Sequence, residues 1–261
     1  MISIVQLGLI DYATGLRLQE RLVALRKEGQ IGDVLLLLEH SPVITLGRNA
    51  KAHNVLVSAS ELAKRGVELF ECDRGGDVTF HGPGQLVGYP IFDLRGFRSK
   101  EGRRATLGAV EFVRRLEEVL IRTCGQFGIA TERVPGLTGV WTSAKEGCVQ
   151  GKIAAIGVHI SRGVTSHGFA LNVNTELGQF NVIVPCGITS KPVTSMEKEL
   201  GRQVSMSVVR DAVSRKFAEV FETEIQRVDS LDALMAAPAD TPMKPPAELR
   251  RILGEEEVFW A

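Results

Sequence analysis

The chain has 261 residues, of which 44% are hydrophobic and 24% are charged, as is typical of a soluble globular protein with one sizeable core. Lysine plus arginine and aspartate plus glutamate each number 31, so no net charge favours nucleic acid or a membrane surface as a partner. The first residues have no basic region ahead of an apolar core, so we expect no signal peptide, and the longest apolar run, 34–38, is too short to span a membrane. We therefore expect a cytoplasmic protein.

The first half of the chain mixes strand and helix patterns without a strict βαβ rhythm. The apolar run "DVLLLLEH" is typical of a strand buried on both sides. Ser58 and Glu61 form a capping-box pattern at the start of a short helix. In chain order, the patterns predict a strand at 2–7, a helix at 11–28, a strand at 33–40 continued at 43–47 after Pro42, a helix at 58–65 and a strand at 67–73.

A glycine-rich stretch, "RGGDVTFHGPGQLVGYP", covers residues 74–90. Its glycines and prolines predict an exposed loop, and glycine permits close approach of a ligand to the backbone. The stretch matches neither GxxxxGK[ST] nor GxGxxG, so a nucleotide-binding loop is poorly supported. A purely structural hairpin explains the composition equally well.

The second half predicts two amphipathic helices with strands between them. They are a helix at 106–127, with Leu107, Val110, Val113, Leu116 and Leu120 on its buried side, short strands between 129 and 174, and a helix at 208–221. The sequence thus predicts one α+β domain over 1–228, built on a mixed sheet flanked by helices. Residues 229–261, rich in Ala, Pro and Glu, are expected to form a loosely ordered tail.

Cysteine chemistry depends on what surrounds each thiol. The four cysteines form no CxxC pair and have no zinc-like spacing with histidine, so we expect reduced thiols and no metal site. Cys186 stands between a proline and a glycine in "IVPCGI", where it is either a buried strand end or a presented nucleophile. A thiol needs a neighbouring cation or base to become a good nucleophile, which leaves a Cys–Lys or a Cys–His pair. If Lys152 has no catalytic role, it is expected to be the solvated end of a strand. Likewise, a His167 without such a role is expected to be a hydrogen-bonded core histidine.

Five motifs together make the sequence resemble the lipoyl(octanoyl) transferase family. In order they are "LEHSPVITLGR", "RGGDVTFHGPGQLVGYP", "GKIAAIG", "HGFALNVN" and "IVPCGI". The resemblance implies the catalytic-domain fold of biotin and lipoate protein ligases. It also implies a catalytic dyad that falls on Cys186 and Lys152, with Cys186 carrying an octanoyl thioester and Lys152 acting as acid and base.

The resemblance further implies the substrates and their binding residues. The resemblance implies transfer of an octanoyl or lipoyl group from acyl-carrier protein to a lysine of lipoyl domains or of the glycine cleavage H protein, without ATP, metal or other cofactor. We also expect the protein to be a monomer. Ser166 and Phe169 depart from common family residues, which bears on the shape of the acyl pocket. The substrate-binding residues that it implies are Arg74, Gly75, Gly76, Asp77, Val78, Thr79, Phe80, His81, Ala155, Ile156, Gly157, Gly168, Phe169 and Ala170.

Two alternatives stay open beside the transferase. An ATP-dependent lipoate or biotin ligase of the same fold would activate its acid as an adenylate and need no thiol. A non-catalytic binder of lipoyl domains or carrier protein would form complexes but no covalent adduct.

Overall fold

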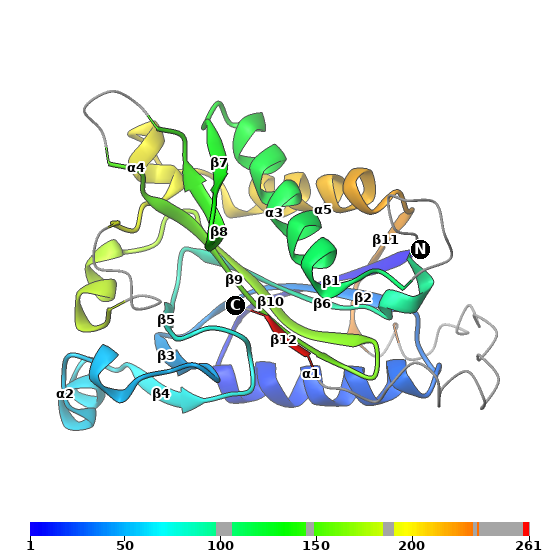
Figure 1. Cartoon of the computed structure of the whole chain (residues 1–261), viewed down its shortest axis with the longest axis horizontal. Helices are drawn as coiled ribbons and strands as arrows, with labels where there is room; N and C mark the ends of the chain where they lie inside the picture. Colours follow the sequence, from blue (N-terminus) through cyan, green and yellow to red (C-terminus); the bar gives the residue numbers. More distant parts are fainter. Residues whose placement is uncertain (98–105, 145–148, 185–190, 232–233, 235–257, 261) are drawn as a thin grey trace.

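One large mixed sheet organises the chain (Figure 1). The computed structural model describes residues 1–97, 106–144, 149–184, 191–231, 234 and 258–260. The described strands of this sheet follow the order β11-β1-β2-β6-β10-β9-β8-β7, with β12 beside β9. They are β1 (Ile2–Ile10), β2 (Asp33–His40), β6 (Gln85–Ile91), β7 (Thr131–Val134), β8 (Leu137–Thr142), β9 (Lys152–Ser161), β10 (Val164–Asn172), β11 (Ile225–Val228) and β12 (Val258–Trp260).

The sheet is mixed, as the sequence predicts. β1 is parallel to both β2 and β11, whereas the pairs from β2 to β7 and the β9–β12 pair are antiparallel. The run "DVLLLLEH" forms β2, which is buried along most of its length because it lies inside the sheet with both faces covered.

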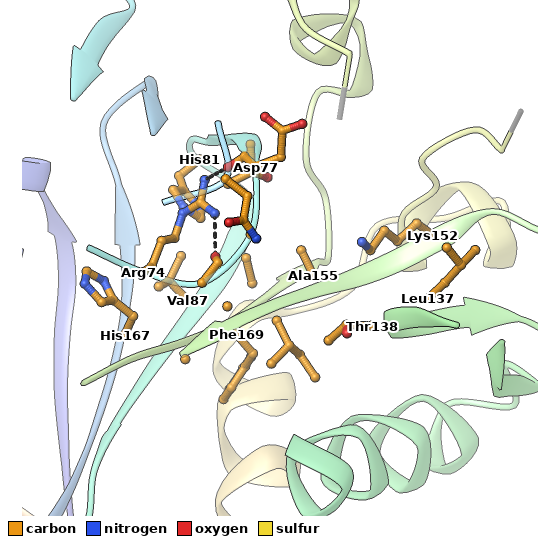
Figure 2. Close-up of a pocket in the computed structure, with 18 of the residues that line it drawn as sticks. Arg74, Asp77, His81, Val87, Leu137, Thr138, Lys152, Ala155, His167 and Phe169 are labelled. Atoms are coloured by element: carbon orange, nitrogen blue, oxygen red, sulfur yellow. Dashed lines mark hydrogen bonds between the residues drawn. The ribbon is translucent and has the colours of Figure 1, made fainter. Parts of the chain in front are cut away.

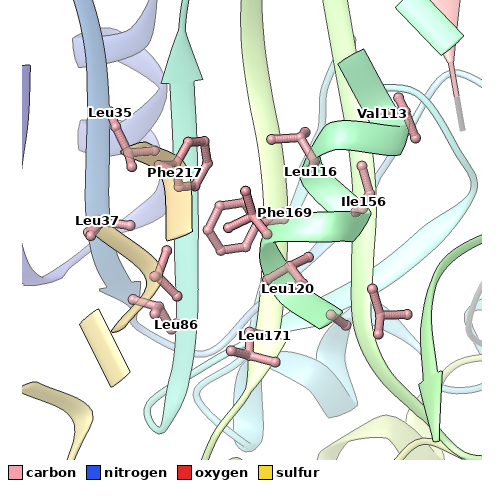
Figure 3. Close-up of a cluster of buried hydrophobic side chains, with 14 of the residues drawn as sticks. Leu35, Leu37, Leu86, Val113, Leu116, Leu120, Ile156, Phe169, Leu171 and Phe217 are labelled. Carbon is pink, nitrogen blue, oxygen red and sulfur yellow. The ribbon is translucent and has the colours of Figure 1, made fainter. Parts of the chain in front are cut away.

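Helices cover the two faces of the sheet unequally. α3 (Ala109–Gln126) and α5 (Met206–Phe221) pack together on one face, and α1 (Tyr12–Lys27) lies on the other (Figure 1). The face beneath α3 and α5 carries the larger apolar core, in which Leu116, Leu120 and Phe217 are fully buried (Figure 3). Burial of each such side chain contributes about 1.5–3 kcal/mol to folding. The predicted helix at 106–127 is confirmed, but Val110, expected on its buried side, is exposed.

A second, three-stranded sheet lies beside the first. Its order is β4 (Glu68–Glu71), β3 (Val43–Leu46) and β5 (Val78–His81). β3 therefore does not continue β2 in the main sheet, because the chain bends at Pro42, which cannot supply a ladder N–H. The remaining helices are η1 (Ala52–Asn54), α2 (Ala59–Lys64), η2 (Leu94–Gly96), η3 (Leu177–Val182) and α4 (Met196–Leu200). Ser58 caps α2 by accepting a hydrogen bond from the Glu61 amide, as the motif predicts.

The glycine-rich stretch is less exposed than the sequence predicts. Residues 78–81 and 85–91 are the buried strands β5 and β6, which belong to the two different sheets. The glycines are needed for close packing: a Cβ on Gly88 would lie 2.2 Å from the ring of Phe169. The exposed loop predicted from the glycine and proline content is confined mainly to residues 74–77 and the turn at 82–84.

The C-terminal region adds two strands to the main sheet, β11 at its β1 end and β12 beside the internal strand β9. β11 pairs with β1, and β12 pairs with β9 opposite residues 158–160. The predicted tail falls largely outside the described residues, so its boundary after residue 228 stays a prediction. None of the described helices combines the length and apolar composition that crossing a bilayer requires.

Candidate active site

A cavity of about 350 Å³ lies between the main sheet, the start of α1 and the second sheet (Figure 2). That volume is within the range of small-molecule sites. Figure 2 shows Lys152 towards one end of the cavity and Arg74 and His167 towards the other, with Ala155 between them.

Small residues of β9 and β10 form one side of the cavity. Gly157 pairs directly with Gly168, and Ala155 pairs with Ala170. Directly opposed residues of an antiparallel pair share one face of the sheet, so these four residues form a shallow surface that we call the small-residue trough. A trough without bulky side chains leaves room for an extended apolar chain along the two strands.

The loop at residues 74–77 closes over the trough. A Cβ on Gly157 would lie 2.5 Å from the carbonyl oxygen of Gly75, so only glycine lets the loop approach this closely. The buried guanidinium of Arg74 holds the loop: it donates to the Thr45 hydroxyl at 3.0 Å and to the carbonyl oxygens of Thr45 at 2.7 Å and Asp77 at 2.6 Å. The loop is thereby tied to β3 and to itself.

Some residues of the predicted binding stretch 74–81 line the cavity, and others are packed in the core of the second sheet. Arg74, Gly75, Gly76, Asp77, Thr79 and His81 line the cavity. Val78 and Phe80 point elsewhere, into the apolar core of the second sheet, because alternate residues of a strand face opposite sides.

The predicted binding residues on β9 and β10, 155–157 and 168–170, also differ in where their side chains point. All six residues line the cavity, but Ile156 and Phe169 have their side chains in the larger core. The Phe169 ring stacks on Phe217 at 6.0 Å and points away from the trough (Figures 2 and 3). The Phe169 side chain thus shapes the core behind the trough, and not the trough surface itself.

Lys152 is buried, with 8% of its surface exposed, although a strand-terminal lysine is usually solvated. Its backbone N–H donates to the Pro192 carbonyl at 2.8 Å, and its carbonyl accepts from the Thr194 N–H at 2.9 Å. These bonds fix the start of β9 against residues 192–194 and hold the amine at the cavity.

Cys186 lies outside the described residues, which leaves its geometry with Lys152 untested. The chain on both sides of 185–190 is described. The Val184 N–H donates to the Asn54 carbonyl at 2.8 Å, and the segment that begins at Lys191 pairs with Lys152. The described residues that flank 185–190 are therefore anchored, Val184 to Asn54 and residues 192–194 to Lys152 at the cavity.

Neutral, buried polar groups lie at the end of the cavity away from Lys152, where Tyr89 and His81 line it and His40 and Gln85 lie behind them. The Tyr89 hydroxyl donates to His40 Nε2 at 2.7 Å, and His81 Nδ1 donates to the Gln85 amide oxygen at 2.7 Å. Burial lowers the pKa of His40 to about 4 and that of His81 to about 3. Both imidazoles are uncharged at neutral pH.

A carboxylate beside the cavity binds two further histidines. His159 Nδ1 donates to Asp73 at 2.5 Å and His167 Nε2 donates to it at 2.7 Å. The hydrogen bonds from His159 and His167 hold the pKa of Asp73 well below its usual range, and burial lowers the pKa of His167. This pair of bonds links the beginning of the 74–77 loop to β9 and β10.

Several lining residues were not predicted from the sequence. Tyr12 and Tyr89 sit in segments with ordinary helix and strand patterns, and the β7–β8 turn reaches the cavity only through the sheet topology. For His167 the sequence leaves a hydrogen-bonded core position and a functional role equally open. The unpredicted lining residues are Tyr12, Asn49, Lys51, Val87, Tyr89, Gly136, Leu137, Thr138 and His167. Among the described residues, no group of three or more His, Cys, Asp or Glu side chains is placed to hold a metal ion.

Taken together, the cavity offers an apolar trough that ends at a buried amine. Such an arrangement can align an extended acyl chain and place its reactive end beside Lys152. An amine there can stabilise a nearby anion when protonated and accept a proton when neutral.

Comparisons with known proteins identify the same architecture. Residues 11–218 match the lipoyl protein ligase A/B catalytic domain. The chain is 58% identical to an octanoyltransferase of Koribacter versatilis over 252 residues, 97% of each protein. It is 56% identical to an octanoyltransferase of Acidobacterium capsulatum over 88% of this chain and 94% of the relative.

Solved structures share the fold at low sequence identity. A bipartite lipoate protein ligase of Thermoplasma acidophilum superposes with a TM-score of 0.67 at 18% identity, over 97% of this chain and 92% of that one. A lipoate-protein ligase A bound with ATP gives a TM-score of 0.63 at 16% identity, over 97% and 92% of the two chains. The predicted ligase-like fold is confirmed, and the chain belongs to the family of lipoyl protein ligase A/B catalytic domains.

Proposed function

We propose that this protein is an acyltransferase that moves an octanoyl group from acyl-carrier protein to a specific lysine of lipoyl domains or of the glycine cleavage H protein. The observation that carries the proposal is the small-residue trough ending at the buried amine of Lys152, in a chain 58% identical to an octanoyltransferase. The reaction would form an acyl thioester on Cys186 and then an amide on the acceptor.

The trough suits the acyl chain. Ala155 and Ala170 face each other across β9 and β10, and Val87 lines the cavity from the next strand. Each methylene buried there contributes about 0.8 kcal/mol, so an eight-carbon chain gains several kcal/mol for positioning. The substrate-binding role extends to the loop residues Arg74 to His81 that line the cavity.

Lys152 and Cys186 are the proposed catalytic dyad. The anchoring of residues 192–194 to Lys152 supports a thiol close to the amine, because only a short segment separates Cys186 from that pairing. As a cation, Lys152 would stabilise the thiolate that attacks the incoming thioester. As a neutral amine, it would take the proton from the acceptor lysine as the amide bond forms and the Cys186 thiolate leaves.

The energetics require no nucleotide. Exchange of one thioester for another is nearly balanced, and formation of an amide from a thioester is downhill. We therefore propose that the enzyme works without ATP, metal or other cofactor. We also propose that it acts in the cytoplasm as a monomer, with residues 1–228 as the catalytic domain.

A transfer assay without ATP tests this function. Octanoyl-carrier protein and an unmodified lipoyl domain should yield octanoylated domain, and Lys152→Ala should slow the reaction by about a hundredfold or more. Normal transfer by Lys152→Ala would refute its acid–base role. ATP–pyrophosphate exchange dependent on free octanoate would favour the ligase alternative, and tight binding without any transfer would favour the non-catalytic binder.

A further inference from the structure

Trp141 is one of the largest fully buried side chains and lies directly beside Lys152. The two residues are opposed across β8 and β9, and Trp141 is only 1% exposed. The Lys152 ammonium lies over the indole ring, 5.2 Å from its centroid. A lysine cation within about 6 Å of an aromatic face is attracted by the ring quadrupole, most strongly by tryptophan.

The indole N–H of Trp141 is buried without a hydrogen bond to any described residue. A buried donor without a partner costs free energy. Packing alone would be served by a phenyl ring or an aliphatic side chain without that cost, so the indole face itself is the feature that calls for an explanation.

Gly139, two residues before Trp141, leaves room for the aliphatic part of Lys152. A Cβ at this position would lie 2.8 Å from Lys152 Cε and 2.6 Å from the Ala154 carbonyl oxygen. The glycine also has φ +118°, which other residues rarely adopt. The lysine side chain thus runs past Gly139 and reaches the face of Trp141.

A buried carboxylate fixes the strand that provides this surface. Glu117 of α3 is fully buried and accepts a hydrogen bond from the Gly139 N–H at 3.2 Å. Its other oxygen accepts from Arg114 at 2.7 Å and from Arg133 at 3.0 Å. β8 is therefore held to α3 at the residue that contacts Lys152.

We propose that Trp141 is a positioning residue for Lys152: its indole face holds the ammonium group at the end of the cavity, and Gly139 provides the space for the side chain to reach it. The inference rests on the proposed function of Lys152 as the acid and base. Lys191 Nζ also lies over this ring, at 5.5 Å, but donates to the Gln150 amide oxygen at 2.8 Å, outside the trough.

Substitutions that keep or remove the aromatic face test the inference. Trp141→Leu keeps an apolar side chain but removes the ring, and should lower kcat about tenfold while KM for octanoyl-carrier protein changes by less than about twofold. Trp141→Phe restores a ring and should recover kcat to within about threefold of wild type. Thermal unfolding of each variant gives the folded fraction for which the rates are corrected.

A second pair of variants separates positioning from backbone strain. Gly139→Ala places a methyl group against Lys152 Cε and should lower kcat about tenfold. Gly128→Ala introduces a side chain at a similar left-handed position, φ +81°, with nothing within 4 Å. It should lose stability but keep the wild-type kcat. Equal kcat values for these two variants would contradict the role of Gly139.

The outcomes distinguish this inference from the proposed function. Slow transfer by Lys152→Ala together with wild-type kcat in Trp141→Leu would overturn the positioning role and leave the dyad intact. Equal losses in Trp141→Leu and Trp141→Phe would also overturn it, because the aromatic face would then be irrelevant. Normal transfer by Lys152→Ala would overturn the acid–base role and, with it, the basis of the inference.

Discussion

The two faces of β9 and β10 show how one pair of strands supplies both a core and a cavity. On the face beneath α3 and α5, Ile156, Phe169 and Leu171 are large and closely packed. On the opposite face, the small-residue trough lies open to the cavity. Because side chains alternate along a strand, a sequence such as Ala-Ile-Gly-Val specifies both surfaces at once. The contrast suggests that the first face provides stability and the second provides function.

The two faces also differ in the side chains that dominate them. The face beneath α3 and α5 contains a cluster of aromatic rings, in which Phe217 contacts Phe92 and Phe221. The cavity face instead has a buried guanidinium at Arg74 and a neutral imidazole at His81. Burial lowers the pKa of His81 in the cavity wall and of His40 behind it, so we expect the cavity side to lose stability as the pH falls.

Phe217→Ala should have the largest effect and tests the core side of the comparison. Removing the fully buried ring should lower the free energy of unfolding by about 3–5 kcal/mol, because a cavity is left in a closely packed region. Urea unfolding measures this loss. Octanoyl transfer per folded molecule should stay within about twofold of wild type, since the ring does not line the trough.

Val208→Ala, on the exposed side of the same helix, is the matched control. This side chain is 49% exposed, so the free energy of unfolding should change by less than about 0.5 kcal/mol. A large loss of transfer by folded Phe217→Ala would show that the two faces are not separable.

The second-largest effect is expected from acidification, which should lower the free energy of unfolding through histidines on the cavity side. The pKa of His40 is lowered from 6.5 to about 4, so the unfolded state binds its proton first as the pH falls. Its contribution to stability is complete above pH 6.5 and is lost between pH 6.5 and 4, by about 3 kcal/mol at most. His81, with a pKa of about 3, extends the loss to lower pH.

Chemical unfolding at a series of pH values checks this expectation. His40→Asn should reduce the dependence of the unfolding free energy on pH between 6.5 and 4. Replacement of the exposed His53 by Asn should leave it as in wild type. Identical pH dependence in all three proteins would mean that His40 does not stay neutral in the folded state.

Gly157→Ala should have the smallest effect of the three perturbations, and it should change the rate of transfer and not the free energy of unfolding. The new methyl group would meet the Gly75 carbonyl oxygen and displace the 74–77 loop, and transfer should fall by about tenfold to a hundredfold. Steady-state kinetics measure this fall. Gly32→Ala adds a methyl group with nothing within 4 Å and should retain full activity. Full activity in Gly157→Ala would show that the loop can move without harm.

Local patterns predicted much of the fold. The apolar run of β2 and the Ser58 cap depend on neighbouring residues only, and both are confirmed. The pairing of β3 with β4 and β5, and the exposure of Val110, depend on partners far away in the sequence. No local pattern could show that β3 belongs to a second sheet.

The site was predictable only in part, because several of its residues are brought together from distant parts of the sequence. Resemblance to the family identified the loop at 74–81 and the small residues of β9 and β10, many of which line the cavity. Tyr12 and Trp141 carry no local signal, because only the topology brings Tyr12 to the cavity and Trp141 to Lys152. The split of Val78 and Phe80 away from the cavity follows from strand alternation, which the motif alone does not reveal.

The most direct test of the account is the intact mass of the protein after exposure to octanoyl-carrier protein without ATP. The account predicts one octanoyl adduct, located on Cys186 by peptide mapping, sensitive to hydroxylamine and transferred to a lipoyl domain when that domain is added. An unmodified protein that nevertheless octanoylates the domain, or a Cys186→Ser variant that transfers at the wild-type rate, would contradict it.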